Sequence, residues 1–205
     1  MLDRYIVPLL KRPLRAMAVS LNQFQVSADR LTVIGFLFGL LCVGLIATGQ
    51  PYLALSALLL NRLIDGIDGE LARLQTPTDA GGYLDITLDF IFYALFPVGF
   101  ALLDPIHNAL PAVVLVASFV GTGASFLAFS SLAEKRGIKH PTFDYKGFYY
   151  LNGLAEGTET IACFVLMCLL PYQFPLLAWS FAVICAITAV NRVVFGYRTL
   201  RRSVV

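Results

Sequence analysis

The chain has 205 residues, of which 58% are hydrophobic and only 14% are charged. Soluble domains usually carry about 45–50% apolar and about 25% charged residues, so the composition excludes a soluble enzyme and a disordered chain. The formal net charge of +2 is too small to indicate a nucleic-acid partner. The composition therefore predicts an all-α integral membrane protein.

Residues 1–25 resemble neither a signal peptide nor a membrane span. Apolar residues recur there at roughly helical spacing, with three basic residues between them. This pattern predicts an amphipathic helix that lies in the membrane interface and is bent or restarted at Pro8 and Pro13. The alternative is a basic tail that contacts lipid and has no structure of its own.

Long apolar stretches follow this N-terminal segment. A membrane span needs about 20 mostly apolar residues. The sequence predicts six transmembrane helices, at about residues 31–49, 52–72, 82–103, 109–132, 155–170 and 176–196. The second and third qualify only if acidic residues are allowed inside the bilayer. Because the connections are short, residues 1–205 are expected to form a single membrane domain.

The basic residues indicate how the chain is oriented. All but two of the 15 lysines and arginines lie on one side of the predicted spans, and the exceptions, Arg62 and Arg192, lie within spans. The positive-inside rule then places both termini in the cytoplasm. We therefore expect a protein of the bacterial inner membrane whose site opens to the cytoplasm.

The second and third spans contain four carboxylates, Asp65, Asp68, Asp85 and Asp89. A charge near the middle of the bilayer costs about 2.5–3.5 kcal/mol on insertion scales, so such residues are candidates for function. At 100° per residue, the first two acids share a helix face with Gly69 and Ala72. The last two share a face with Gly81. A turn at residues 76–78 would bring the two faces together.

Four converging carboxylates would repel one another strongly at low dielectric constant. Divalent cations with oxygen ligands remove this repulsion, and Mg²⁺ is usually shared with substrate phosphates. The acids therefore predict a metal–phosphate site. The alternative is a set of structural acids paired with Arg62, Arg73 and Arg192.

Two sequence segments carry a family resemblance. Residues 65–73 read DGIDGELAR, and residues 81–89 read GGYLDITLD. Together they resemble the signature of the class I, membrane-integral CDP-alcohol phosphatidyltransferases, DxxDGxxAR followed by GxxxDxxxD. All eight signature residues are present, with a gap one residue shorter than the usual eight or so. Residues 26–32 are similar to the family's entrance motif only at Thr32.

The resemblance implies a reaction in phospholipid biosynthesis. A CDP-linked lipid such as CDP-diacylglycerol would pass its phosphatidyl group to the hydroxyl of a polar acceptor, releasing CMP. Two divalent ions, Mg²⁺ or Mn²⁺, would be bound by Asp65, Asp68, Asp85 and Asp89, and Asp89 would also be the catalytic base. The residues implied to bind the nucleotide are Asp65, Gly69, Ala72, Arg73, Gly81 and Thr32. Members of the family often form homodimers, so a second copy of the chain is an expected partner.

A second polar group begins the fifth predicted span. Glu156 and Glu159 are three residues apart and share a helix face. We expect them to form an acceptor pocket with Lys135, Arg136 and Arg192. The alternative is a capped helix start with interfacial acids and a packing contact. The basic residues favour a phosphorylated acceptor and the acids an ammonium or a polyol, and we prefer a phosphorylated polyol.

Three other classes of protein use or tolerate intramembrane acids. A cation or proton transporter usually shows broken helices or paired repeats, which this sequence lacks. A polyprenyl transferase should carry a second acid-rich motif on a late helix, but the sixth predicted span contains no acid. A non-catalytic membrane scaffold would tolerate Asp→Asn changes. These three remain alternatives at this point.

Overall fold

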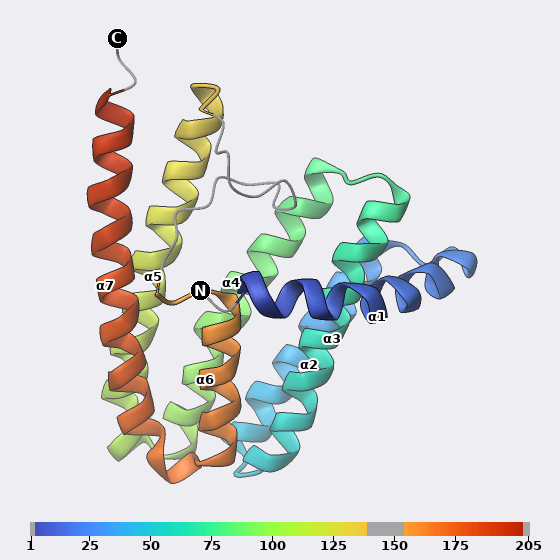
Figure 1. The fold of residues 1–205 in the computed structure, drawn as a ribbon. Helices are drawn as coiled ribbons and strands as arrows, with labels where there is room; N and C mark the ends of the chain where they lie inside the picture. The colour runs from blue at the N-terminus through green and yellow to red at the C-terminus, as the bar shows by residue number, and fades with distance from the viewer. Residues whose placement is uncertain (1–2, 139–153, 203–205) are drawn as a thin grey trace.

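The computed structural model describes residues 3–138 and 154–202, and nearly all of them are helical (Figure 1). No strand occurs among these residues. The helices in chain order are α1 (Asp3–Gln23), α2 (Ala28–Ala47), α3 (Pro51–Gln75), α4 (Asp79–Leu103), α5 (Pro105–Lys135), α6 (Gly157–Leu169) and α7 (Phe174–Arg202), with a short 3₁₀ turn, η1 (Pro171–Gln173), before α7. The predicted all-helical class is confirmed.

The first helix lies roughly crosswise to the long helices in Figure 1 and packs on α3. A Cβ atom on Gly66 of α3 would stand 2.9 Å from a methyl carbon of Leu14, so the glycine allows this close approach. One helix runs through both Pro8 and Pro13, so α1 does not restart at either proline, and a bend there stays a prediction. The position of α1 in the membrane interface stays a prediction.

Each predicted span overlaps one helix of the structure. Within the described residues, α2, α4, α5 and the segment Pro171–Arg201 are long and apolar enough to cross a membrane. The charged residues of α3 interrupt its apolar stretch. The fifth predicted span, 155–170, holds only the 13 residues of α6, which rise about 20 Å, less than the hydrocarbon core of about 30 Å. The number of six spans therefore stays a prediction.

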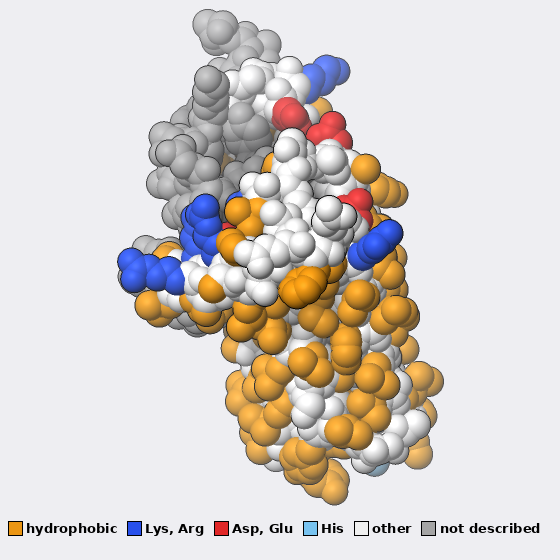
Figure 2. All heavy atoms as spheres, turned by 90° about the vertical axis from the view of Figure 1, so that its right-hand side faces the viewer, with side chains coloured by type: hydrophobic (Ala, Val, Ile, Leu, Met, Phe, Trp, Pro, Cys, Tyr) orange, Lys and Arg blue, Asp and Glu red, His pale blue; other side chains and the backbone are white. Residues whose placement is uncertain are grey.

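Apolar and charged side chains are separated along the molecule. On the face seen in Figure 2, hydrophobic side chains cover the lower part of the view, while the blue and red side chains gather at the level of the crosswise helix and above it. This separation is typical of a membrane protein whose apolar part spans the bilayer and whose charged end lies in water.

Aromatic stacking fixes α4 against the later helices. The rings of Phe96 and Phe164 stack with centroids 3.8 Å apart, and those of Phe100 and Phe174 with centroids 4.4 Å apart. Phe92 of α4 packs against α2 as well, because a Cβ atom on Gly39 of α2 would stand 2.7 Å from its ring. The rings are buried, so α4 is fixed against α2, α6 and α7, which places its acidic N-terminal half.

Local residues explain where the helices begin. Pro51 and Pro105 occupy first helical positions, where their fixed φ suits the helix and no amide hydrogen is lost. Thr78 caps α4, and its hydroxyl accepts a hydrogen bond from the Gly81 amide at 3.0 Å. Asp104 caps α5, and its hydrogen bond with the His107 ring holds the pKa of this carboxyl below its ordinary value.

Candidate active site

The turn between α3 and α4 brings the predicted acids together. One carboxylate oxygen each from Asp65, Asp68 and Asp85 lie within 4.8 Å of one another. A narrow cavity of about 10 Å³ is lined by all three and also by Asp89. A volume of this size holds about one water molecule. The four side chains thus converge, as their helix faces predicted.

The three grouped carboxylates fit a divalent cation. Asp68 is only 4% exposed, and its Oδ2 atom has no hydrogen-bond partner among the described residues. Leaving a buried carboxylate oxygen unsatisfied is costly. Within the same part of the chain, neither Asp68 nor Asp85 forms an ion pair. Three oxygen ligands of this kind suit Mg²⁺ or Mn²⁺.

Asp89 does not join this group of three. Its Oδ1 atom accepts a hydrogen bond of 2.8 Å from Nη2 of Arg62. The other terminal nitrogen of Arg62 lies 3.5 Å from Oδ2 of Asp65. The alternative prediction of structural ion pairs therefore holds for Asp89, and one oxygen of Asp65 also lies near Arg62. It does not describe Arg73, which pairs with Glu70 at 2.7 Å, or Arg192, which lines another cavity.

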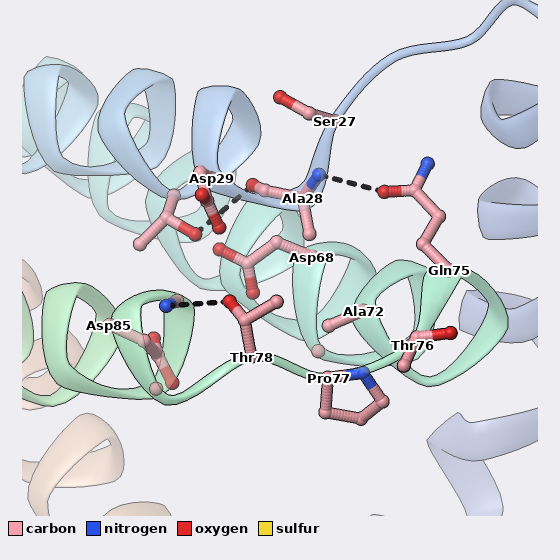
Figure 3. A pocket seen from close by; sticks show the side chains of 14 residues that line it. Ser27, Ala28, Asp29, Asp68, Ala72, Gln75, Thr76, Pro77, Thr78 and Asp85 are labelled. Carbon is pink, nitrogen blue, oxygen red and sulfur yellow. Dashed lines mark hydrogen bonds between the residues drawn. The ribbon is translucent and has the colours of Figure 1, made fainter.

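A larger cavity of about 320 Å³ opens beside the acids at the start of α2, the end of α3 and the start of α4 (Figure 3). Four of the six residues predicted to bind the nucleotide line it, because they lie on the facing turns of these helices: Thr32, Gly69, Ala72 and Gly81. The predicted metal ligand Asp68 lines it too. Asp85 also lines it, so Asp68 and Asp85 border both cavities. The metal candidates thus form one wall of the larger cavity.

Two residues predicted to bind the nucleotide do not line this cavity. Asp65 faces only the narrow cavity. Arg73 has a half-exposed side chain that pairs with Glu70, and its Nη1 atom would lie 3.8 Å from a Cβ atom on Gly69. Arg73 is therefore beside the larger cavity, and the spacing of three residues from Glu70 explains its orientation.

The sequence analysis missed two polar residues of the larger cavity. Asp29, in the first turn of α2, points into it in Figure 3. Gln75 lines it and ties down the connection before α2: its Oε1 atom accepts from the Ala28 amide at 3.3 Å, and its Nε2 atom donates to the Val26 carbonyl at 2.6 Å. A serine and an acid at a helix start were a usable signal for Asp29. Gln75 gave none.

A third cavity, of about 160 Å³, lies between α4, α5 and α7 near the start of α6. Glu156 and Arg192, both predicted to bind the acceptor, line it and are each 8% exposed. Arg192 donates to the Thr122 carbonyl at 3.2 Å and lies over the Phe126 ring. This places a buried carboxylate and a buried guanidinium on one cavity.

The other three residues predicted to bind the acceptor do not line that cavity as far as the described residues define it. Lys135 and Arg136 lie at the far end of α5, where Arg136 donates a hydrogen bond to the Leu200 carbonyl on α7. Glu159 lies in the first turn of α6 and is half-buried. Their role in binding an acceptor stays a prediction.

The site residues and the fold together correspond to a known family. The family model described as CDP-alcohol phosphatidyltransferase matches residues 25–190. The chain belongs to the CDP-alcohol phosphatidyltransferase family. The resemblance drawn from the paired aspartate motifs is thereby confirmed, and the matched range covers helices α2 to α6 and most of α7.

Two curated proteins are similar to this chain in sequence. Inner membrane protein YnjF of Escherichia coli is 50% identical over 201 residues, which cover 98% of each chain. Archaetidylinositol phosphate synthase of Pyrococcus horikoshii is 30% identical over 116 residues, which cover 56% of this chain and 62% of that one. The first supports a bacterial membrane location for this chain.

Solved structures of one further member share the fold. Phosphatidylinositol phosphate synthase of Mycobacterium tuberculosis, in complex with manganese and citrate, has a TM-score of 0.72 at 19% identity and covers 90% of this chain and 88% of its own. The same protein with CDP-DAG bound has a TM-score of 0.68 at 21% identity. The arrangement of helices described above is therefore that of a CDP-alcohol phosphatidyltransferase.

Proposed function

We propose that the chain transfers the phosphatidyl group of a CDP-linked lipid, such as CDP-diacylglycerol, to the hydroxyl of a polar acceptor and releases CMP. One observation carries this proposal: Asp68 and Asp85 border both the narrow acidic cavity and the cavity of about 320 Å³. A diphosphate lying across this border would reach the carboxylates on one side while its nucleoside occupied the larger cavity.

In the proposed site, Asp65, Asp68 and Asp85 would hold a divalent cation, Mg²⁺ or Mn²⁺. A cation held there would offset the negative charge of the diphosphate and of the leaving CMP. The manganese of the structurally similar mycobacterial enzyme supports this choice. Gly69, Ala72 and Gly81 leave room for the nucleotide, because they carry little or no side chain on the wall of the cavity.

Asp89 is the proposed base. The acceptor oxygen would attack the β-phosphorus, a new P–O bond would form, and the P–O bond to CMP would break. The hydroxyl proton would pass to a carboxylate oxygen of Asp89. A positioned general base typically contributes about 10²–10⁴-fold in rate. The place of Asp89 on α4, one turn after Asp85 and beside the narrow cavity, supports this role.

The proposed acceptor is a phosphorylated polyol bound in the cavity of Glu156 and Arg192. A buried guanidinium offers a charge-assisted fork to phosphate oxygens. A buried carboxylate accepts hydrogen bonds from polyol hydroxyls. The name of the Pyrococcus relative, an archaetidylinositol phosphate synthase, is consistent with an acceptor of this kind. Glu159, Lys135 and Arg136 remain proposed members of the wider pocket.

The proposed orientation places six helices, α2 to α7, across the inner membrane and α1 in its cytoplasmic interface. Both termini and the acidic cavity would then face the cytoplasm, in keeping with the distribution of the basic residues. A lipid substrate could keep its acyl chains in the bilayer while its CDP group and the acceptor stay in water. A homodimer is the proposed assembly.

The test is release of CMP by the purified protein in lipid nanodiscs. CDP-diacylglycerol and Mg²⁺ would be supplied with a panel of acceptors that includes inositol phosphate, glycerol 3-phosphate, inositol and serine. We expect CMP release with a phosphorylated polyol and none with Asp68→Asn. No CMP release with any acceptor, together with cation uptake by proteoliposomes, would favour a transporter and overturn the proposal.

A further inference from the structure

Arg62 is the one residue of the acidic cavity with a positive charge among the residues described as lining it. Its side chain is 14% exposed and lies over the rings of Phe92 and Tyr93, with its Cζ atom 5.3 Å and 5.5 Å from the two ring centroids. Stacking on aromatic faces favours a guanidinium over an ammonium. The surroundings of position 62 therefore favour arginine over lysine.

A chain of hydrogen bonds fixes the direction of this guanidinium. Buried Asn61 donates to the Gly35 carbonyl of α2 at 2.8 Å, and its side-chain oxygen accepts from Nε of Arg62 at 2.7 Å. The terminal nitrogens then reach two further groups, the Tyr93 hydroxyl at 3.2 Å and Asp89 at 2.8 Å. With Nε bonded to Asn61 of α3, Nη2 faces Asp89 of α4, and Nη1 lies 3.5 Å from Oδ2 of Asp65.

The hydrogen bond between Arg62 and Asp89 involves the one acid of the four that lies outside the group of three. Asp65, Asp68 and Asp85 each offer an oxygen to a common point, and Asp89, which carries the short bond to Arg62, does not. Tyr93, the second partner on α4, also lines the cavity of Glu156 and Arg192. Arg62 thus contacts Asp89 at 2.8 Å, Asp65 at 3.5 Å and, through Tyr93, a residue on the wall of the proposed acceptor pocket.

We propose that Arg62 is a positioning residue that keeps Asp89 off the metal and directs it toward the acceptor hydroxyl. The proposal rests on the function proposed above and assigns three acids, not four, as metal ligands before substrate binds. Arg62 also supplies a fixed positive charge that offsets one carboxylate of the cluster. Removing it would release Asp89 to join the other three acids.

The decisive experiment is a double-mutant cycle read by Mn²⁺ binding, with free Mn²⁺ followed by electron paramagnetic resonance and no substrate present. Arg62→Ala should bind Mn²⁺ about tenfold more tightly than the wild type, because a positive charge is lost and a ligand is gained. Asp89→Asn should then weaken Mn²⁺ binding at least about tenfold more in the Arg62→Ala background than in the wild type. Asp85→Asn is the matched control and should weaken binding equally in both backgrounds.

Turnover gives a second, independent reading. We expect Arg62→Ala to lower kcat about 10²-fold, the lower part of the range for a general base, with the KM for CDP-lipid changed less than about threefold. Arg62→Lys keeps the charge but loses the fork, so it should bind Mn²⁺ like the wild type and recover part of kcat. A purely structural role would lower Mn²⁺ affinity and turnover together.

The outcomes separate this inference from the proposed function. Equal losses from Asp89→Asn in both backgrounds would show that Asp89 is already a metal ligand, and would overturn the role of Arg62. If Arg62→Ala does not fold, unchanged kcat in Arg62→Lys overturns it as well. A wild-type protein that binds Mn²⁺ but releases no CMP would overturn the proposed function, while the Mn²⁺ cycle would still decide the placement of Asp89.

Discussion

A Cβ atom on Gly81 would stand 2.9 Å from Oδ1 of Asp29. Asp29 lies in the first turn of α2 and Gly81 in the first turn of α4, and both line the cavity proposed for the nucleotide. Real Cβ contacts are essentially never that short, so an alanine at position 81 would force the Asp29 carboxylate to shift. The signature glycine therefore has a steric partner in this chain.

The first prediction concerns this contact. Gly81→Ala should displace the Asp29 carboxylate and raise the KM for CDP-lipid about tenfold, or about 1.4 kcal/mol, with kcat affected less. Gly44→Ala is the control, because it lies on an exposed face of α2 and its Cβ atom would meet nothing within 4 Å. The steric explanation fails if both variants give the same KM.

The second prediction concerns the metal. Excess EDTA should abolish CMP release, and Mg²⁺ or Mn²⁺ should restore it, because three close carboxylates need a cation to lie so near one another. Asp68→Asn should lose Mn²⁺ binding, measured by calorimetry, which also gives the number of ions, expected to be two. Asp104→Asn, an acid between α4 and α5 outside the site, should behave as the wild type. Full turnover in excess chelator would contradict the metal assignment.

The third prediction concerns the connection before α2. Gln75→Leu removes the side-chain hydrogen bonds to Ala28, Val26 and Asn22. Each lost bond is worth about 0.5–1.5 kcal/mol, so amide hydrogen exchange at residues 24–28 should be at least about fivefold faster. The KM for CDP-lipid should rise, because this segment leads directly into Asp29 in the first turn of α2. Gln50→Leu, at the other end of α3, is the control, and equal exchange in both variants would refute the link.

The fourth prediction concerns the acceptor. Glu156→Gln and Arg192→Lys should each raise the acceptor KM at least about tenfold, since a charged hydrogen bond is worth about 1.5–3 kcal/mol, while the KM for CDP-lipid stays within about threefold. Arg198→Lys, an exposed arginine on the same helix as Arg192, should change neither KM. Changes below about threefold at both cavity positions would place the acceptor elsewhere.

Much of this arrangement could be predicted because it depends on local spacing. Pro51 and Pro105 mark helix starts by their own geometry, and the 100° rule put Asp65 and Asp68 on one face with Gly69 and Ala72. The acids were conspicuous because charges within apolar segments are rare. For the same reason, Glu156 and Arg192 could be singled out in the sequence as candidates for a shared pocket.

The remaining features depend on contacts between distant residues, which spacing cannot show. Arg62 and Asp89 are 27 residues apart, and Gln75 and Ala28 are 47 apart. Asp29 and Gly81 meet only because α2 and α4 pack closely at Gly39 and Phe92. Lys135 and Arg136 were expected near Arg192 by charge alone, but about two turns of α7 separate Arg192 from Leu200, whose carbonyl accepts a hydrogen bond from Arg136.

The shortness of α6 has a physical consequence for how the two substrates meet. A helix of 13 residues leaves a hydrophobic mismatch of about 10 Å with an average bilayer, which lipids accommodate by local thinning. In the proposed orientation, this thinning would bring the lipid headgroups toward Glu156 at the head of α6. A water-soluble acceptor would then have less hydrocarbon to pass before it met the reactive phosphorus, and the rate would depend on bilayer thickness.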